Sequence, residues 1–225
     1  MQQATEAAGV PVVTGDTKVV DRGKGDGVFI NTTGLGLVPP GVHVSPQRAR
    51  PGDVVLINGA IAVHGIAIMS VREGLDFETA LESDSAPLHH LVASILDVAG
   101  DQVHVLRDPT RGGLASTLNE IAVQAQVGIR LEETRIPLWE EVRGACEILG
   151  LDPLYVANEG KCLVFVAREA AERVLAAMRD SALGQEAAII GEVIEDHPGR
   201  VTMRSRIGGI RIVDVLSGEQ LPRIC

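Results

Sequence analysis

The stretch VHVLRDPTRGGLASTLNEIAVQA, residues 103–125, holds the pattern that decides the fold. Its first four residues, Val103-His104-Val105-Leu106, predict a strand. Its second half places apolar side chains three or four residues apart, which predicts a helix with one buried face: Leu114, Leu118, Ile121, Ala122 and Ala125. A glycine loop joins the two. We therefore expect a strand–loop–helix unit of an α/β protein, with Gly128 just past the end of the helix.

The same alternation continues on both sides of that unit. We expect strands at residues 54–57, 162–167, 188–194, 201–207 and 210–213, and helices at 60–72, 88–96, 139–149 and 171–178. Gly208-Gly209 between the last two strands indicates a two-residue hairpin. The order of elements predicts an α/β fold, an α+β sandwich in which helices flank a mixed sheet.

The first forty residues are organised differently. A helix over residues 1–9 is expected to end at Gly9, and apolar runs at 10–13, 18–20 and 28–38 predict strands. Pro39-Pro40-Gly41 marks the expected boundary between domain 1–40 and domain 41–219, which a flexible tail, 220–225, follows. Residues 1–40 hold too few elements to close a domain, so either they complete a partner's sheet or the chain is a fragment.

Composition excludes several classes of function. Acidic residues number 30 against 20 basic ones, a net charge of −10, which argues against nucleic-acid binding. No apolar run reaches the ~20 residues of a membrane span and no signal peptide is visible, so we expect a cytoplasmic protein. Cys146 and Cys162 fall on apolar faces and are expected in the core. The loop signatures of P-loop NTPases, dinucleotide-binding folds and zincins are absent.

The first candidate for chemistry is Gly15-Asp16-Thr17-Lys18. A glycine lets the backbone approach a ligand closely, Asp16 is suited to hold Mg²⁺, and Lys18 can neutralise a phosphate or a developing oxyanion. The alternative is a turn with solvated charges.

The second candidate is the loop Arg107-Asp108-Pro109-Thr110-Arg111-Gly112-Gly113, which follows a strand and opens a helix. Glycines there expose amide N–H groups to an anion, and the arginines add charged donors. The alternative is a helix entry that Asp108 or Thr110 caps, with the arginines solvated.

Two further motifs stand near the C-terminal end. Asn158-Glu159-Gly160-Lys161 precedes a buried strand, where Glu159 could serve as a general base or belong to a polar turn. The chain ends in Pro222-Arg223-Ile224-Cys225, which predicts a thiol on an extended, mobile arm. Its pKa should lie near ~8.5.

These motifs in this order, with the Pro-Arg-Ile-Cys terminus, resemble HypE, the carbamoyl dehydratase family of hydrogenase maturation. That family belongs to a superfamily with aminoimidazole ribonucleotide synthetase, selenophosphate synthetase and thiamine-monophosphate kinase. The resemblance covers essentially the whole chain. It implies the C-terminal domain of the aminoimidazole ribonucleotide synthetase-like fold, preceded by the last strands of an N-terminal ATP-binding domain whose remainder supplies much of the nucleotide site in the family.

The resemblance also implies an activity. A carbamoyl group carried on Cys225 would be dehydrated with ATP to a thiocyanate, which supplies cyanide to the iron of [NiFe]-hydrogenase. Cys225, Lys18 and Glu159 would be catalytic, and Asp16 would bind Mg²⁺. Asp16, Thr17, Lys18, Asp108, Gly112 and Gly113 would contact the nucleotide or shape the pocket.

The implied partners are the carbamoyltransferase HypF, the HypC-HypD iron scaffold and a second copy of the chain. Two other hypotheses remain open from the sequence. The chain could belong to another ATP-dependent member of the superfamily, such as a selenophosphate synthetase. It could also be a dimerising and partner-docking fragment without turnover, because part of the nucleotide site is not in this sequence.

Overall fold

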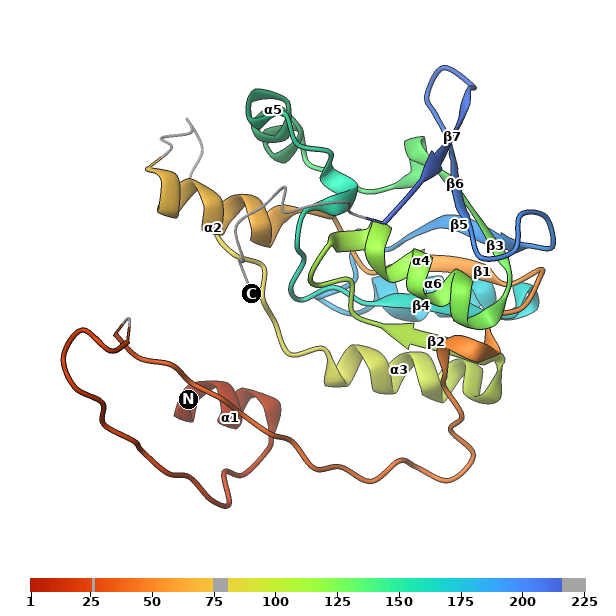
Figure 1. Ribbon diagram of the computed structural model, residues 1–225. Coiled ribbons are helices and arrows are strands. Elements are labelled where there is room, and N and C mark those ends of the chain that lie inside the picture. Colours follow the sequence, from red (N-terminus) through yellow and green to blue (C-terminus); the bar gives the residue numbers. More distant parts are fainter. Residues whose placement is uncertain (26, 75–80, 216–225) are drawn as a thin grey trace. The chain divides into compact units, whose positions relative to one another are not determined.

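The computed structural model describes residues 1–25, 27–74 and 81–215. The chain divides into two compact units, Met1–Pro40 and Gly41–Cys225 (Figure 1). We call them unit 1 and unit 2 and describe each by itself.

Unit 2 is built on a sheet that has seven strands in the described residues. They are β1 (Val54–Ile57), β2 (Val103–Arg107), β3 (Gly128–Glu132), β4 (Leu163–Val166), β5 (Ala188–Ile194), β6 (Val201–Arg204) and β7 (Ile210–Val213). Their order across the sheet is β2-β4-β1-β5-β3-β6-β7. Neighbours are antiparallel except β3 and β6, which run parallel. The predicted mixed sheet is confirmed.

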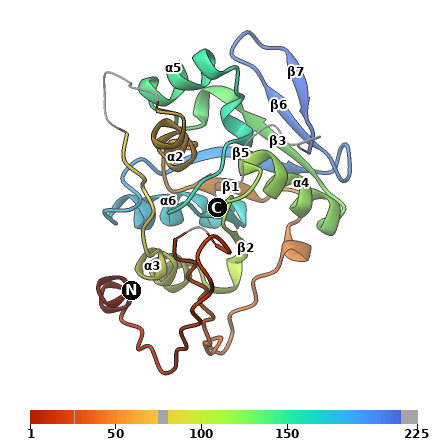
Figure 2. The same cartoon turned by 60° about the vertical axis from the view of Figure 1, so that its left-hand side comes forward.

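Helices cover both faces of this sheet. They are α2 (Val63–Glu73), α3 (His89–Ala99), α4 (Gly113–Ala125), α5 (Glu140–Leu149) and α6 (Ala171–Arg179). Alternate residues of β1 face opposite sides: Val55 and Ile57 pack with α2, α4 and α5, whereas Val54 and Leu56 pack with α3 and α6. Figures 1 and 2 both place α3 at the opposite end of unit 2 from the β6–β7 hairpin. The apolar helix faces predicted from periodicity are therefore the core.

Two local predictions around the helices of unit 2 were wrong. Helix α2 begins at Val63 rather than residue 60, because the backbone N–H groups of Ile61 and Ala62 bond to other loops and Ala62 has a φ of +69°. Gln126, not Gly128, ends α4 in the left-handed conformation. Gly128 instead opens β3, where a Cβ would lie 1.9 Å from the Asp196 carbonyl oxygen.

The hairpin prediction was also wrong in its length. β6 ends at Arg204 and pairs with Ile210 at the start of β7, so residues 205–209 form the connection. Ser205 N–H donates to the Gly209 carbonyl oxygen, and Gly208 N–H donates to the Ser205 carbonyl oxygen. These bonds close a wider loop than the two glycines alone would make.

Unit 1 contains the helix α1 (Gln2–Ala8), which ends at Gly9 with a φ of +65°, as predicted. The strands expected at 10–13, 18–20 and 28–38 are absent from the described residues of this unit. An isolated strand leaves its backbone groups unpaired, and no described residue of unit 1 forms a ladder with these segments. Their apolar side chains are exposed instead, with Val13 at 87% and Leu35 at 99%. No described helix is both long and apolar enough to span a bilayer.

Candidate functional site

Three loops meet at one edge of the sheet in unit 2. β1 and β2 end where β4 begins, because both are antiparallel to β4: Ile57 and Arg107 each pair with Leu163. The loops that leave β1 and β2 and the loop that enters β4 therefore converge. They contain residues 58–62, 108–112 and 156–162.

Two buried asparagines tie these loops together. Asn158 accepts a hydrogen bond from Ala62 N–H at 2.7 Å and donates to the Pro109 carbonyl oxygen at 2.9 Å. Asn58 accepts from Cys162 N–H at 2.7 Å and donates to the carbonyl oxygens of Gly160 and Leu183 at 3.1 and 2.8 Å. Each side chain thus satisfies backbone groups that would otherwise be buried without partners.

Glu159 lies between these anchored positions. Its neighbours in the chain, Asn158 and Gly160, are held by the bonds just described, while Glu159 itself is half-buried. Gly160 has a φ of +61°, and a Cβ there would lie 2.1 Å from the Asp84 carbonyl oxygen. The predicted Asn158–Lys161 motif is therefore a constrained loop and Glu159 is its partly accessible side chain.

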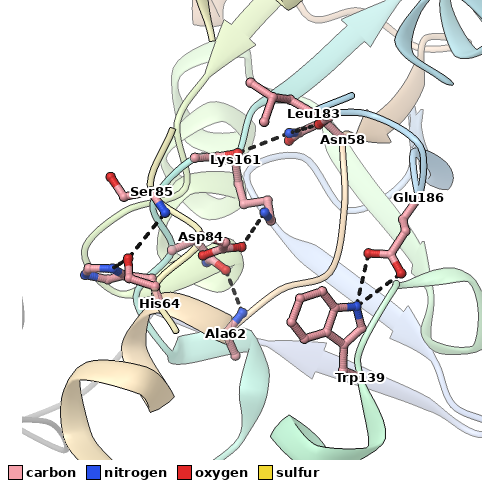
Figure 3. A network of polar contacts seen from close by, with 12 residues as sticks. Asn58, Ala62, His64, Asp84, Ser85, Trp139, Lys161, Leu183 and Glu186 are labelled. Carbon is pink, nitrogen blue, oxygen red and sulfur yellow. Dashed lines mark hydrogen bonds and ion pairs between the residues drawn. The ribbon is translucent and has the colours of Figure 1, made fainter. Parts of the chain in front are cut away.

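The loop carries an ion pair with the segment before α3. Lys161 Nζ contacts Asp84 Oδ2, and the two side chains are only 11% and 19% exposed. Next to this pair, Ser83 Oγ lies 2.7 Å from His64 Nδ1 on α2. Figure 3 shows Lys161 and Asp84 pointing toward each other, with Asn58 above them. Trp139, whose indole N–H donates to the Glu186 carboxylate, lies to the right in this view.

The loop between β2 and α4 has the predicted strand–loop–helix order. Gly112 precedes α4 with a φ of +72°, and no side chain caps the helix. A Cβ on Gly113 would lie 2.5 Å from the Leu154 carbonyl oxygen, so packing requires this glycine. Arg107 pairs with Asp108 and with Glu120 at the surface. Nucleotide contacts by Asp108, Gly112 and Gly113 stay a prediction.

The remaining predicted site residues are not brought to this edge by any described contact. Asp16, Thr17 and Lys18 lie exposed in unit 1, where Asp16 Oδ1 accepts from Thr17 N–H at 2.8 Å. Cys225 lies outside the described residues. Glu159 and the Asp108–Gly113 loop are thus the part of the predicted site that unit 2 brings together, through Asn158 and Pro109.

The other two cysteines lie in the core, as predicted. Cys162 opens the buried strand region beside Lys161, and burial raises its pKa to about 12. Burial, followed by the charge of Asp152, raises the pKa of the Cys146 thiol to about 11. Neither thiol is positioned as a nucleophile.

Sequence reasoning missed Asn58 and Asp84. Asn58 follows the apolar run of β1 directly, and a polar residue at the end of a buried strand is a signal that could have found it. Asp84 lies in an irregular segment between helices, and its pairing with Lys161 is a long-range contact without a local pattern.

The fold of unit 2 corresponds to a known class of protein domain. Residues 50–204 match the family model described as AIR synthase related protein, C-terminal domain. Unit 2 is therefore a C-terminal domain of the AIR synthase related class.

Closer relatives narrow the class. Carbamoyl dehydratase HypE of Azotobacter vinelandii is 60% identical over all 225 residues. The structure of a HypE-HypF complex matches with a TM-score of 0.89 and 43% identity, covering 96% of this chain and 70% of that chain. A HypE structure in complex with ATP matches with a TM-score of 0.88 and 45% identity, covering 99% of this chain and 68% of that one. The chain belongs to the HypE family, which confirms the resemblance seen in the motifs.

The match does not extend over the relatives' full length. This chain spans 66% of the Azotobacter vinelandii protein, just under two thirds.

Proposed function

We propose that this chain takes part in the ATP-dependent dehydration of a carbamoyl group carried on Cys225, which yields a thiocyanate for the cyanide ligand of [NiFe]-hydrogenase iron. The observation that carries the proposal is the joining of the Asp108–Gly113 and Asn158–Lys161 loops at one sheet edge, with Glu159 between fixed neighbours. Membership of the HypE family supports it.

The reaction needs a leaving group and a base. The carbonyl oxygen of S–C(=O)–NH₂ attacks the γ-phosphorus of ATP, and ADP departs. The product is an O-phosphorylated imidate after loss of one N–H proton. Loss of the second N–H proton while the C–O bond breaks releases phosphate and leaves S–C≡N. Both protons must pass to bases, which is general base chemistry.

We assign the role of base to Glu159. Its half-buried carboxylate stands on a loop whose neighbouring residues are fixed, so its position is pre-organised. Lys18 would stabilise the charge that develops on the amide or on the transferred phosphoryl group. The Asp108–Gly113 loop would shape the pocket that the tail enters.

The Gly15–Lys18 motif of unit 1 carries side chains suited to binding a polyphosphate and its metal ion. Asp16, Thr17 and Lys18 are exposed, and a Cβ on Gly15 would have no atom within 4 Å. They do not complete a Mg²⁺ site, because the described residues contain no group of three or more histidines, cysteines or carboxylates. We propose Asp16 as one ligand of a Mg²⁺ site and assign no step to the metal.

The solved structure of a HypE-HypF complex supports HypF as the partner that would load Cys225. We propose, from the resemblance to the family alone, that the HypC-HypD scaffold would receive the cyanide. We further propose a cytoplasmic homodimer in which residues 10–38 of two copies pair. The exposed apolar side chains of this segment support that pairing, among them Val19, Val28 and Leu37. A monomer by sedimentation at micromolar concentration would contradict it.

Mass spectrometry of the C-terminal peptide tests the reaction. The protein is incubated with HypF, carbamoyl phosphate and ATP, and then digested. We expect a carbamoyl adduct on Cys225 that next loses one water. Cys225→Ala is the matched control and should show neither species.

The same measurement separates the other hypotheses. Loading without water loss would favour a docking role without turnover. Absence of any adduct on the wild-type chain would defeat the proposal.

A further inference from the structure

One buried carboxylate oxygen beside the Asn158–Lys161 loop, Asp84 Oδ1, accepts no hydrogen bond from the described residues. Among the described residues, Asp84 Oδ1 is the buried side-chain oxygen that makes no hydrogen bond. The other oxygen of the same carboxylate, Oδ2, is held by Lys161 Nζ. A buried carboxylate oxygen without a donor is costly, because it has lost water and gained nothing in return. Such an oxygen takes its hydrogen bond from outside the chain, from an ordered water or from a bound ligand.

The position of Asp84 is fixed by the loop that carries Glu159. Its backbone oxygen occupies the space where a Cβ on Gly160 would lie, and its side chain reaches Lys161. Gly160 is also bound through its carbonyl oxygen to Asn58. Asp84 therefore lies against the residues directly after Glu159, and its free oxygen belongs to the same part of the molecule (Figure 3).

The substrate proposed above has a donor of the required kind. A carbamoyl thioester carries two N–H donors on its nitrogen, and its carbonyl oxygen must stay free to attack phosphorus. An acceptor for N–H would hold the donor end of the group and leave the oxygen exposed.

We propose that Asp84 is a further functional residue of the dehydration site: its Oδ1 accepts a hydrogen bond from the carbamoyl N–H, while Lys161 holds Oδ2 in place. This inference rests on the proposed function. Lys161 is then a positioning residue, since it acts through Asp84.

The variant Asp84→Asn tests this role. Lys161 donates hydrogen bonds only, so it will draw the amide oxygen of the new side chain toward itself. The NH₂ group then takes the place of Oδ1 and faces the substrate N–H, donor against donor. We expect Cys225 to be loaded with the carbamoyl group at the wild-type rate. In a single turnover with saturating ATP, dehydration should be about tenfold to a hundredfold slower, because one hydrogen bond to a charged acceptor is lost.

The matched control is Asp101→Asn, which removes a carboxylate paired with Arg48 at the surface of unit 2. Its loading and its dehydration rate should equal those of the wild type. Equal dehydration rates for Asp84→Asn and the wild type would overturn the inference and leave the proposed function standing. A wild-type protein whose Cys225 is loaded but whose carbamoyl group never loses water would contradict both this inference and the proposed function.

A second variant guards against a purely structural effect. Asp84→Asn leaves the largely buried Lys161 without its counter-ion, and that alone can destabilise the fold. The double variant Asp84→Leu with Lys161→Met removes both charges and leaves no acceptor oxygen at position 84 in any orientation. We expect it to recover the thermal unfolding midpoint toward that of the wild type while dehydration stays slow. Recovery of the wild-type dehydration rate in the double variant would show that the pair only maintains the fold, and would overturn the inference.

Discussion

At the scale of single residues, the site depends on asparagine side chains that form hydrogen bonds with backbone groups of its loops. Asn58 and Asn158 are both 2% exposed and each bonds to three backbone groups. An asparagine can do this because its side chain both donates and accepts. The loops around Glu159 are therefore held together by the side chains of these two residues.

Replacing one of these amides should destabilise unit 2. Asn58→Ala leaves the Cys162 N–H and the Gly160 and Leu183 carbonyl oxygens without partners. We expect a loss of about 2–4 kcal/mol in the free energy of unfolding, measured by urea denaturation. Asn31→Ala, at an exposed position, serves as the control and should change stability by less than about 0.5 kcal/mol. A similar small change for Asn58→Ala would contradict the bonding described.

The buried thiols should not react in the folded protein. With pKa values of about 11 and about 12 for Cys146 and Cys162, roughly one thiol in a thousand or fewer is ionised at pH 8. We expect iodoacetamide to modify one cysteine of the native chain, and none in Cys225→Ala. In denaturant, all three cysteines of the wild type should react. Rapid native labelling of Cys162 would show that its strand end opens.

The same thiols give a pH dependence of known sign. Their folded pKa values lie above the ordinary value of 9.0, so above pH 9 the unfolded chain releases protons first. The unfolded state then binds fewer protons, and stability falls as pH rises from about 9 toward 11, by about 1.4 kcal/mol per pH unit for each thiol. Between pH 9 and 11, Cys146→Ala with Cys162→Ala should show a shallower decline in urea denaturation. An unchanged slope would contradict the assignment.

At the scale of elements, backbone conformation decides where the helices begin and end. Gly113 starts α4 with a φ of +62° and packs against the carbonyl oxygens of Leu154 and Val156. Gly144, by contrast, lies inside α5, where an added Cβ would meet no atom within 4 Å. The two glycines thus serve different purposes, and only the first is required by the fold.

That difference predicts opposite effects of the same substitution. Gly113→Ala should cost about 3 kcal/mol or more in the free energy of unfolding, from backbone strain and the clash with Leu154. Gly144→Ala should stabilise by about 0.5–1 kcal/mol, because alanine favours the helix. Thermal unfolding of the two variants beside the wild type measures both signs. Two changes of the same sign would refute this interpretation.

Periodicity predicted most elements of unit 2 because their apolar faces are the core. β3 was missed because Gly128–Glu132 is short and carries charged residues, and only its partners β5 and β6 make it a strand. The motif around Glu159 was visible as a polar interruption before β4. Asp84 was not visible, because its role depends on contact with Lys161 across the fold.

At the scale of the whole molecule, the buried core belongs to unit 2. Both clusters of buried apolar side chains lie between Ala49 and Val213. Unit 1 contributes no described residue to either cluster, and its apolar side chains, among them Val13 and Leu35, are exposed.

Deleting residues 1–40 should therefore leave the unfolding of unit 2 unchanged. We expect thermal midpoints of the whole chain and of 41–225 that agree within about 2 °C in dilute solution, a difference of about 1 kcal/mol or less for a domain of this size. Sedimentation of the same two proteins measures self-association. We expect the whole chain to self-associate and the 41–225 variant to remain monomeric. A large drop in the midpoint of 41–225 would show that unit 1 contributes to the core.

The position of β1 inside the sheet has a consequence for synthesis on the ribosome. Its neighbours β4 and β5 begin only at Leu163 and Ala188, so Val54–Ile57 emerges long before either can pair with it. Such distant pairings close large loops and form slowly. A nascent chain halted between β1 and β4 will expose the four adjacent aliphatic residues of β1, because neither neighbouring strand has yet been synthesised. We expect a chaperone that binds apolar segments to bind the nascent chain at these residues.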